Sequence, residues 1–316
     1  MIRLVFFLVA LVAASAALAQ DIPPLIRIVV PFPPGGSNDV IARAIAPQLA
    51  KRLGNNVIVE NKSGAAGVIG SEAVAKAPRD GSHLLLTSST FVTTAATQAK
   101  LPYDPIAGFT PVAMVAEGPL LVAVPASMPI KSGAELLAAA RAKPGALNYG
   151  TAGVGSVAHL ATELLNGAAN VQMTHVPYKG AANALLDLAA GQINVMISNY
   201  SSIVPQIKAG KVRPIAVTSA KPSPAFPNLA PLSQAVPGYA IEIWVTVFAP
   251  AGTPMPLVER LNREINQISA SPELRTFLDP DGAQPVALAP AAVAGRVKED
   301  LAQLKRIAAQ RKISLD

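Results

Sequence analysis

Short apolar runs rich in valine and isoleucine alternate with helical patterns along most of the chain, and this rhythm constrains the fold most. The first pair shows it, because residues 26–32 predict a strand and 37–53 predict a helix. Further strands are expected at 57–60, 83–87, 147–151, 173–178, 193–198 and 212–218, and further helices at 68–77, 157–166 and 181–190. Strands that alternate with helices form parallel sheets covered by helices, so the sequence predicts an α/β fold.

The N-terminus predicts export. A short basic start precedes an almost wholly apolar run at 4–19, which ends in the small-x-small pattern Ala17-Leu18-Ala19 typical of a signal peptidase site. The alternative is a membrane anchor, but the run is short for a spanning helix and ends in small residues. We therefore expect residues 1–19 to be a signal peptide and the mature chain to lie in the periplasm.

Composition excludes several classes of function. The chain has no cysteine, which rules out disulfides, thiol nucleophiles and cysteine metal sites. Its formal charge is +7, but the basic residues are scattered and aromatic residues make up only 4% of the chain. Nucleic acid is therefore not an expected partner.

No catalytic motif is present in the sequence. The motifs of serine hydrolases, zinc proteases and P-loop nucleotidases are missing, and His83, His159 and His175 show no metal-ligand spacing. The glycines of "SGAAGVIG" (63–70) follow GxxGxxG, whereas a dinucleotide loop needs GxGxxG, so tight helix packing is the preferred interpretation. We expect no catalytic residues, no metal and no cofactor.

Two loops share a pattern that suits anion binding. "PFPPGGSN" (31–38) and "YGTAGVGSVAH" (149–159) each pass from a strand through glycines and small hydroxyls into a helix. Glycines let backbone N–H groups turn toward a ligand, and a helix start adds unpaired donors and a positive dipole end. Each loop could instead be a simple capped turn, with Ser37 and Ser156 as helix caps. Two such loops at carboxyl ends of strands favour a binding cleft.

At these residues the chain resembles a known family. The segments "VPFPPGGSNDVIARAIAPQL", "LPYDPIAGFTPVAMV", "LNYGTAGVGSVAHLATELL", "HVPYKGAANALLDLAAGQINVMI" and "WVTVFAPAGTP" are similar to the Bug-type extracytoplasmic receptors of the tripartite tricarboxylate transporter family. These receptors are periplasmic solute-binding proteins. The chain departs from the family pattern at Ser82-His83, where Tyr-Thr is usual, and at Leu232 and Gln234, where Thr and Glu are usual.

The resemblance implies a Venus flytrap of two doubly wound α/β domains joined by two crossings. Residues 20–122 and 247–316 would form the first domain, and residues 123–246 the second. The crossings are expected near 121–125 and 244–249.

The resemblance also implies that the two glycine loops grip a ligand carboxylate, with side walls from two other strand ends. The expected ligand-binding residues are Phe32, Pro34, Gly35, Gly36, Ser37, Thr87, Ser88, Thr151, Gly153, Gly155, Ser156, Ser198 and Asn199.

The predicted function is a monomeric periplasmic receptor that captures a small organic carboxylate and delivers it to the membrane subunits of a tripartite tricarboxylate-type transporter. Two alternatives stay open at this point: a receptor that reports ligand occupancy to a sensor kinase, and a periplasmic hydrolase or lyase. A dicarboxylate, a tricarboxylate, an acidic amino acid and an aromatic acid are all compatible ligands.

Overall fold

The computed structural model of the 316-residue chain describes residues 22–178 and 180–314. The predicted signal peptide lies outside the described residues. Within them, no helix is both long enough and apolar enough to cross a membrane.

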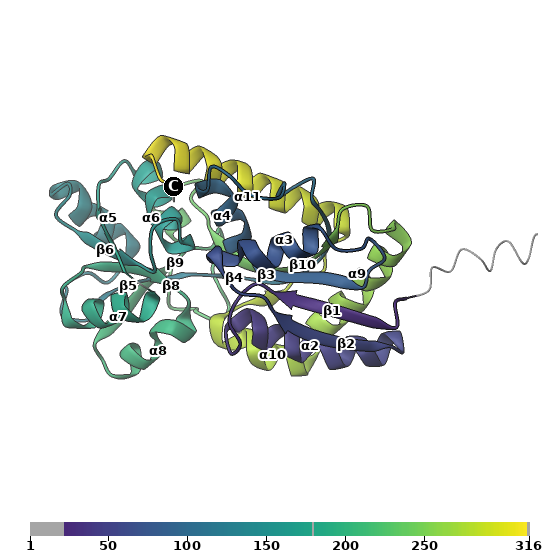
Figure 1. The fold of residues 1–316 in the computed structure, drawn as a ribbon. Helices are drawn as coiled ribbons and strands as arrows, with labels where there is room; N and C mark the ends of the chain where they lie inside the picture. Colours follow the sequence, from purple (N-terminus) through teal and green to yellow (C-terminus); the bar gives the residue numbers. More distant parts are fainter. Residues whose placement is uncertain (1–21, 179, 315–316) are drawn as a thin grey trace, which may run out of the picture.

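The first sheet has six strands in the order β11-β4-β10-β3-β1-β2. Their bounds are β1 Leu25–Val30, β2 Asn56–Asn61, β3 His83–Ser88, β4 Phe109–Pro119, β10 Glu242–Pro250 and β11 Gln284–Pro285. The helices around it are α2 Ser37–Leu53, α3 Val68–Ala75, α4 Thr90–Thr97, α9 Met255–Ser269, α10 Pro272–Leu278 and α11 Pro290–Arg311, with short 3₁₀ turns η1 Ala65–Gly67 and η3 Asp279–Asp281. We call this the first lobe (Figure 1).

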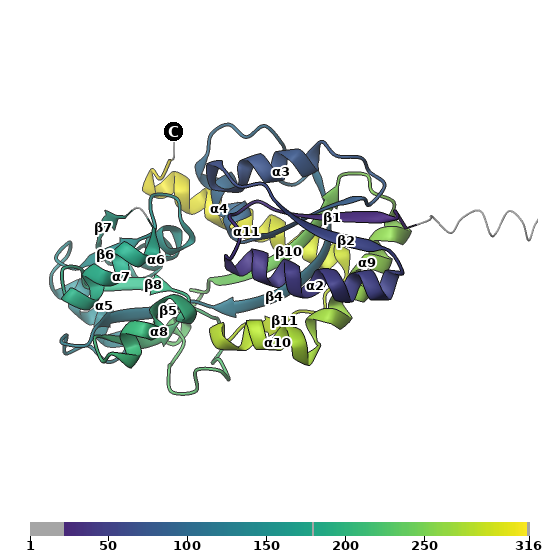
Figure 2. The ribbon, with the colours of Figure 1, turned by 60° about the horizontal axis from the view of Figure 1, so that its bottom comes forward.

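The second sheet has five strands in the order β7-β6-β8-β5-β9. Their bounds are β5 Leu121–Pro125, β6 Asn148–Thr151, β7 Thr174–Pro177, β8 Val195–Ser198 and β9 Val212–Val217. Its helices are α5 Gly133–Ala142, α6 Val157–Ala169, α7 Ala181–Ala190 and α8 Tyr200–Lys208, and the 3₁₀ turn η2 spans Leu232–Gln234. These elements form the second lobe, beside the first (Figures 1 and 2).

Both sheets are buried on two faces, as the sequence pattern predicts. In β1, Ile28 and Val30 pack into the cluster shared with α2 and α9, while Val29 between them packs into the cluster shared with α4 and α11. Successive side chains of a strand point to opposite faces, so an unbroken apolar run needs helices on both sides. The prediction of two doubly wound α/β units is confirmed.

The sheets are mixed, although the alternating pattern predicts parallel sheets. β10 runs antiparallel to β3 and β4, and β5 runs antiparallel to β8 and β9. The two connections between the lobes join β4 to β5 and β9 to β10. A chain that leaves one lobe enters the other from the side of the cleft. Its first strand there, β5 or β10, therefore runs away from the cleft and is antiparallel to neighbours whose carboxyl ends face the cleft.

The changes of sheet fall a few residues before the predicted domain boundaries at 123 and 247. β4 ends at Pro119 and β5 begins at Leu121, while β10 begins at Glu242. The long helix α11 lies along the first lobe and reaches α6 of the second, where Arg311 pairs with Glu163 (Figure 1). Leu232, which departs from the family pattern, is buried in the core of the second lobe.

Candidate ligand-binding site

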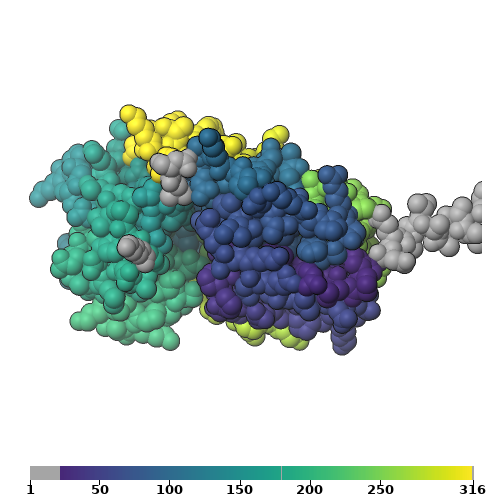
Figure 3. Space-filling model, in the orientation of Figure 1, coloured from purple at the N-terminus to yellow at the C-terminus, as the bar shows by residue number. Residues whose placement is uncertain are grey.

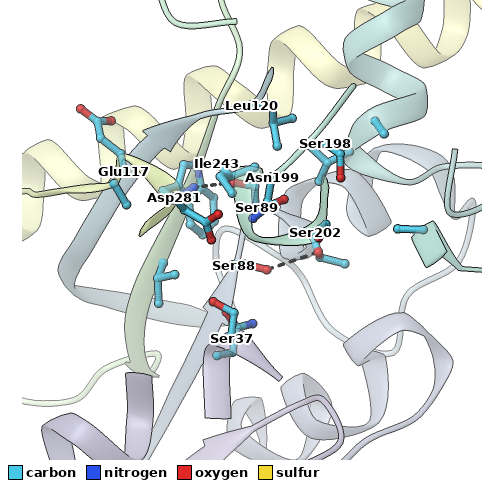
Figure 4. A pocket seen from close by; sticks show the side chains of 18 of the residues that line it. Ser37, Ser88, Ser89, Glu117, Leu120, Ser198, Asn199, Ser202, Ile243 and Asp281 are labelled. Atoms are coloured by element: carbon cyan, nitrogen blue, oxygen red, sulfur yellow. Dashed lines mark hydrogen bonds between the residues drawn. The ribbon is translucent and has the colours of Figure 1, made fainter. Parts of the chain in front are cut away.

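A cavity of about 300 Å³ lies between the two lobes. The space-filling view shows a hollow where the lobes meet, and the close-up shows side chains from both lobes around the cavity (Figures 3 and 4). Polar lining residues are Ser37, Asn38, Ser88, Ser89, Thr90, Glu117, Ser156, Ser198, Asn199, Ser202 and Asp281. Apolar walls come from residues such as Leu120, Ile243, Trp244 and Phe277.

Five of the described helices begin at this cavity. Residues at the starts of α2, α4, α6, α7 and α8 line it, and these helices follow β1, β3, β6, β7 and β8. The first N–H groups of a helix have no partner within the helix and lie at its positive dipole end. Among the described lining residues there is no lysine, arginine or histidine. The arrangement therefore offers backbone dipoles and hydroxyl groups to an anion.

The first glycine loop is held partly by its own helix. The N–H of Gly35, which has a φ of 83°, donates to the Asp39 carboxylate at 2.9 Å. Hydrogen bonds from Arg43, followed in effect by those from Gly35 and Asn61, lower the pKa of Asp39 to about 2 despite its burial. Asp39 thus stays charged at neutral pH, and the Gly35 amide is used within the protein.

The start of α2 is not the turn capped by Ser37 that the sequence analysis gave as the alternative. Gly36 is the N-cap of α2 in extended conformation, with a φ of −75°, so it needs no positive φ. Ser37 therefore does not cap the helix, and no side chain caps this end of α2. Ser37 instead lines the cavity, whereas Phe32, Pro34, Gly35 and Gly36 do not. Phe32 packs half-buried against the first core.

The second glycine loop is also tied back to its own lobe. Gly153 and Gly155 have φ angles of 135° and 74°, and their N–H groups donate to Thr151 Oγ1 at 3.2 Å and His159 Nδ1 at 3.1 Å. Ser156 caps α6, as the sequence allows, because its hydroxyl accepts from the N–H of His159. Of this predicted group only Ser156 lines the cavity. Thr151, Gly153 and Gly155 shape the loop behind it.

The side walls follow the prediction more closely. Ser88, Ser198 and Asn199 all line the cavity, at the ends of β3 and β8. Thr87 does not, because it lies one residue earlier in β3 and its side chain is buried within the lobe.

The structure brings together two histidines that are sixteen residues apart in the chain. The rings of His159 and His175 stack with centroids 3.8 Å apart, and Tyr149 stacks on His175 at 4.9 Å. Burial, followed by the nearby His175, lowers the pKa of His159 to about 4, and burial also lowers that of His175. Both rings are therefore neutral at neutral pH. Neutral His159 can accept the Gly155 N–H, and no group of residues suited to a metal ion occurs among the described residues.

We expect the free energy of unfolding to decrease as the pH falls below the pKa that His159 has in the unfolded chain. The pKa of His159 is about 4 when folded and about 6.5 when unfolded, so the unfolded chain binds more protons between these values. The stabilisation is therefore present above pH 6.5 and about 2 kcal/mol of it is lost by pH 5. Chemical denaturation at pH 7.5 and 5 measures the loss. His159→Gln should remove most of this difference, and an equal loss in both proteins would contradict the assignment.

Several lining residues are not among the ligand-binding residues predicted from the sequence. Ser89 accepts the Trp244 N–H at 2.8 Å and joins the start of α4 to β10. Trp244 is the only tryptophan of the chain, is almost fully buried, and donates its indole N–H to Asp300 at 2.8 Å. Asp281 reaches the cavity from η3, more than 160 residues after β4. Only "TSST" (87–90), a run of small hydroxyls after a strand, could have extended the prediction to Ser89 and Thr90.

Two α/β lobes that enclose a cavity at the carboxyl ends of their strands define the class of two-domain solute-binding proteins. A family model described as tripartite tricarboxylate transporter family receptor matches residues 41–313. The chain belongs to this family, and the Bug-type resemblance is confirmed. It is thus a solute-binding protein and not an enzyme.

Known proteins are similar to this one over almost the whole chain. Protein BugT of Bordetella pertussis is 34% identical over 93% of this chain and 91% of its own length. A structure described as R. palustris Rpa4515 with adipate has a TM-score of 0.77 at 37% identity and covers 92% of this chain and 98% of that one. MatC from Rhodopseudomonas palustris, with bound malate, has a TM-score of 0.73 at 33% identity, over 90% and 98% of the two chains.

Proposed function

We propose that this protein is a periplasmic receptor that captures a small organic carboxylate in the cavity between its lobes. It then delivers the acid to the membrane subunits of a tripartite tricarboxylate-type transporter. The observation that carries the proposal is the convergence of five helix N-termini, from both lobes, on a cavity of about 300 Å³ whose described lining has no basic side chain. Such a site suits an anion that is held by backbone dipoles and hydroxyls.

The solved relatives support the same ligand class. Adipate and malate, named with two of them, are both organic carboxylates. The cavity volume falls at the lower end of the range for small-molecule sites, which suits a ligand of this size.

We assign direct contacts to the predicted residues that line the cavity. The hydroxyls of Ser37 and Ser198 and the amide of Asn199 can donate to carboxylate oxygens. Asn38, at the start of α2, joins this group. The hydroxyls of Ser88 and Ser156 also line the cavity, but they donate to Thr90 Oγ1 and to the Gly153 carbonyl. The remaining predicted residues, which are Phe32, Pro34, Gly35, Gly36, Thr87, Thr151, Gly153 and Gly155, do not line the cavity, and we assign them no direct contact.

A thermal-unfolding screen tests the proposal. Ligand-stripped protein would be heated with organic acids of three to eight carbons and with the matching alcohols and primary amides. We expect at least one acid to raise the unfolding midpoint, because a ligand at one hundred times its dissociation constant stabilises the folded state by about 2.7 kcal/mol. The matching alcohols and amides should have little effect. A shift with neutral sugars or cations, and with none of the acids, would contradict a carboxylate site.

A further inference from the structure

One end of the cavity already holds a carboxylate of the protein. Asp281 comes from η3 of the first lobe and lines the cavity. Its Oδ1 accepts the backbone N–H of Ser201 at 2.6 Å, and its Oδ2 accepts the Ser201 hydroxyl at 3.0 Å. Ser201 lies in the first turn of α8, in the second lobe. Asp281 therefore takes the place at the start of α8 that an anion would otherwise occupy.

The charge of Asp281 has no cationic partner among residues 22–178 and 180–314. Glu117, the other acidic lining residue, differs because Arg296 pairs with it at 2.9 Å. Figure 4 shows the Asp281 carboxylate among the labelled polar residues, whereas the Glu117 carboxylate lies at the edge of the group. The part of the cavity next to α8 is thus negatively charged, unlike the parts next to α2 and α6.

We propose that Asp281 determines specificity: the ligand carries a hydrogen-bond donor, such as an ammonium or hydroxyl group, at the end that reaches α8, and not a second carboxylate. This inference rests on the proposed function, since it takes the ligand's first carboxylate to lie at the starts of α2 and α6. A second carboxylate near the half-buried Asp281 would place two like charges together, which disfavours binding. A donor there would form a charge-assisted hydrogen bond.

On this proposal, the ligand of this chain differs in chemistry from those named with two solved relatives. Adipate and malate each have two carboxylates. In this chain, a dicarboxylate long enough to reach α8 would meet the Asp281 oxygens, which the Ser201 N–H and hydroxyl already hold in position.

Matched ligands and matched variants test the proposal. Acids of three to seven carbons would be used in three forms: the unsubstituted monocarboxylate, the ω-amino acid and the dicarboxylate. Binding to the wild type, Asp281→Asn and Asp279→Asn would be measured by calorimetry and by the fluorescence of Trp244, which lines the cavity. Asp279→Asn is the control, because it removes a charge from the same turn at an exposed residue that pairs with Arg275 and does not line the cavity.

For at least one chain length, the ω-amino acid should bind the wild type at least tenfold more tightly than the dicarboxylate. Asp281→Asn, which keeps an oxygen acceptor for Ser201, should reduce this ratio at least tenfold, and Asp279→Asn should leave it within twofold. A wild type that prefers dicarboxylates, or an Asp281→Asn variant that changes all three forms equally, would overturn the inference and leave the proposed function standing. If no acid binds to protein shown to be folded by circular dichroism, the proposed function itself fails.

Discussion

Replacing Ser88 with phenylalanine is expected to weaken carboxylate binding by at least a hundredfold, or about 2.7 kcal/mol. Ser88 is the last residue of β3 and lines the cavity, where its hydroxyl donates to Thr90 Oγ1 at 3.3 Å. A phenyl ring at this position would occupy much of a cavity of about 300 Å³ and would cover the N–H groups at the start of α4. The ring would enter the cavity and not the packed core, so the fold should persist.

The effect of Ser88→Phe is measured by calorimetric titration with an acid identified in the thermal screen. Ser63→Phe is the control, because Ser63 is exposed in the loop after β2 and does not line the cavity. The control should bind within twofold of the wild type, and circular dichroism should show both variants folded. A Ser88→Phe variant with unchanged affinity would mean that the ligand binds elsewhere.

Gly155→Val is expected to weaken binding by at least tenfold, although Gly155 does not itself line the cavity. Its φ of 74° lies in the left-handed region, where a β-branched residue costs about 1–3 kcal/mol. The chain can relieve this strain only by moving the loop, which breaks the bond from Gly155 to His159 and displaces Ser156. Gly155→Ala, with a smaller side chain, should show the same effect more weakly and provides a folded variant if valine is not tolerated.

Gly36→Val is the matched control on the other loop. Gly36 has an extended backbone, and a Cβ there would meet its nearest neighbour, the Pro33 carbonyl oxygen, at an ordinary 3.6 Å. We expect affinity within about twofold of the wild type. Calorimetric titration of Gly155→Val, Gly155→Ala and Gly36→Val measures the three affinities. A loss of binding in Gly36→Val with full binding in Gly155→Val would reverse the roles assigned to the two loops.

The sequence predicts the lobes well because burial on two faces leaves a strong pattern. The helix expected at 37–53 is α2, and the helix expected at 181–190 is α7, residue for residue. The pattern does not reveal strand direction, since a buried strand such as β5 is apolar whichever way it runs. The antiparallel strands follow from where the chain crosses between lobes, which is a property of the whole fold.

The candidate site could be predicted in position but not in detail. A glycine after a strand indicates a turn, yet only the structure shows that the Gly35 amide binds Asp39 and that the Gly155 amide binds His159. Thr87 and Ser88 look alike in the sequence, but the alternation of side chains along β3 turns only Ser88 toward the cavity. Asp281 belongs to a turn far from every motif and reaches the cavity only because η3 packs against α8.

The most direct test is a crystal structure of the protein with a carboxylate identified in the screen. We expect the carboxylate oxygens to lie in the cavity between the lobes, 2.7–3.2 Å from N–H groups at the starts of α2 and α6 and from hydroxyls such as those of Ser37 and Ser198. A carboxylate bound outside this cavity, or held there by a lysine or arginine side chain instead of backbone N–H groups and hydroxyls, would contradict this expectation.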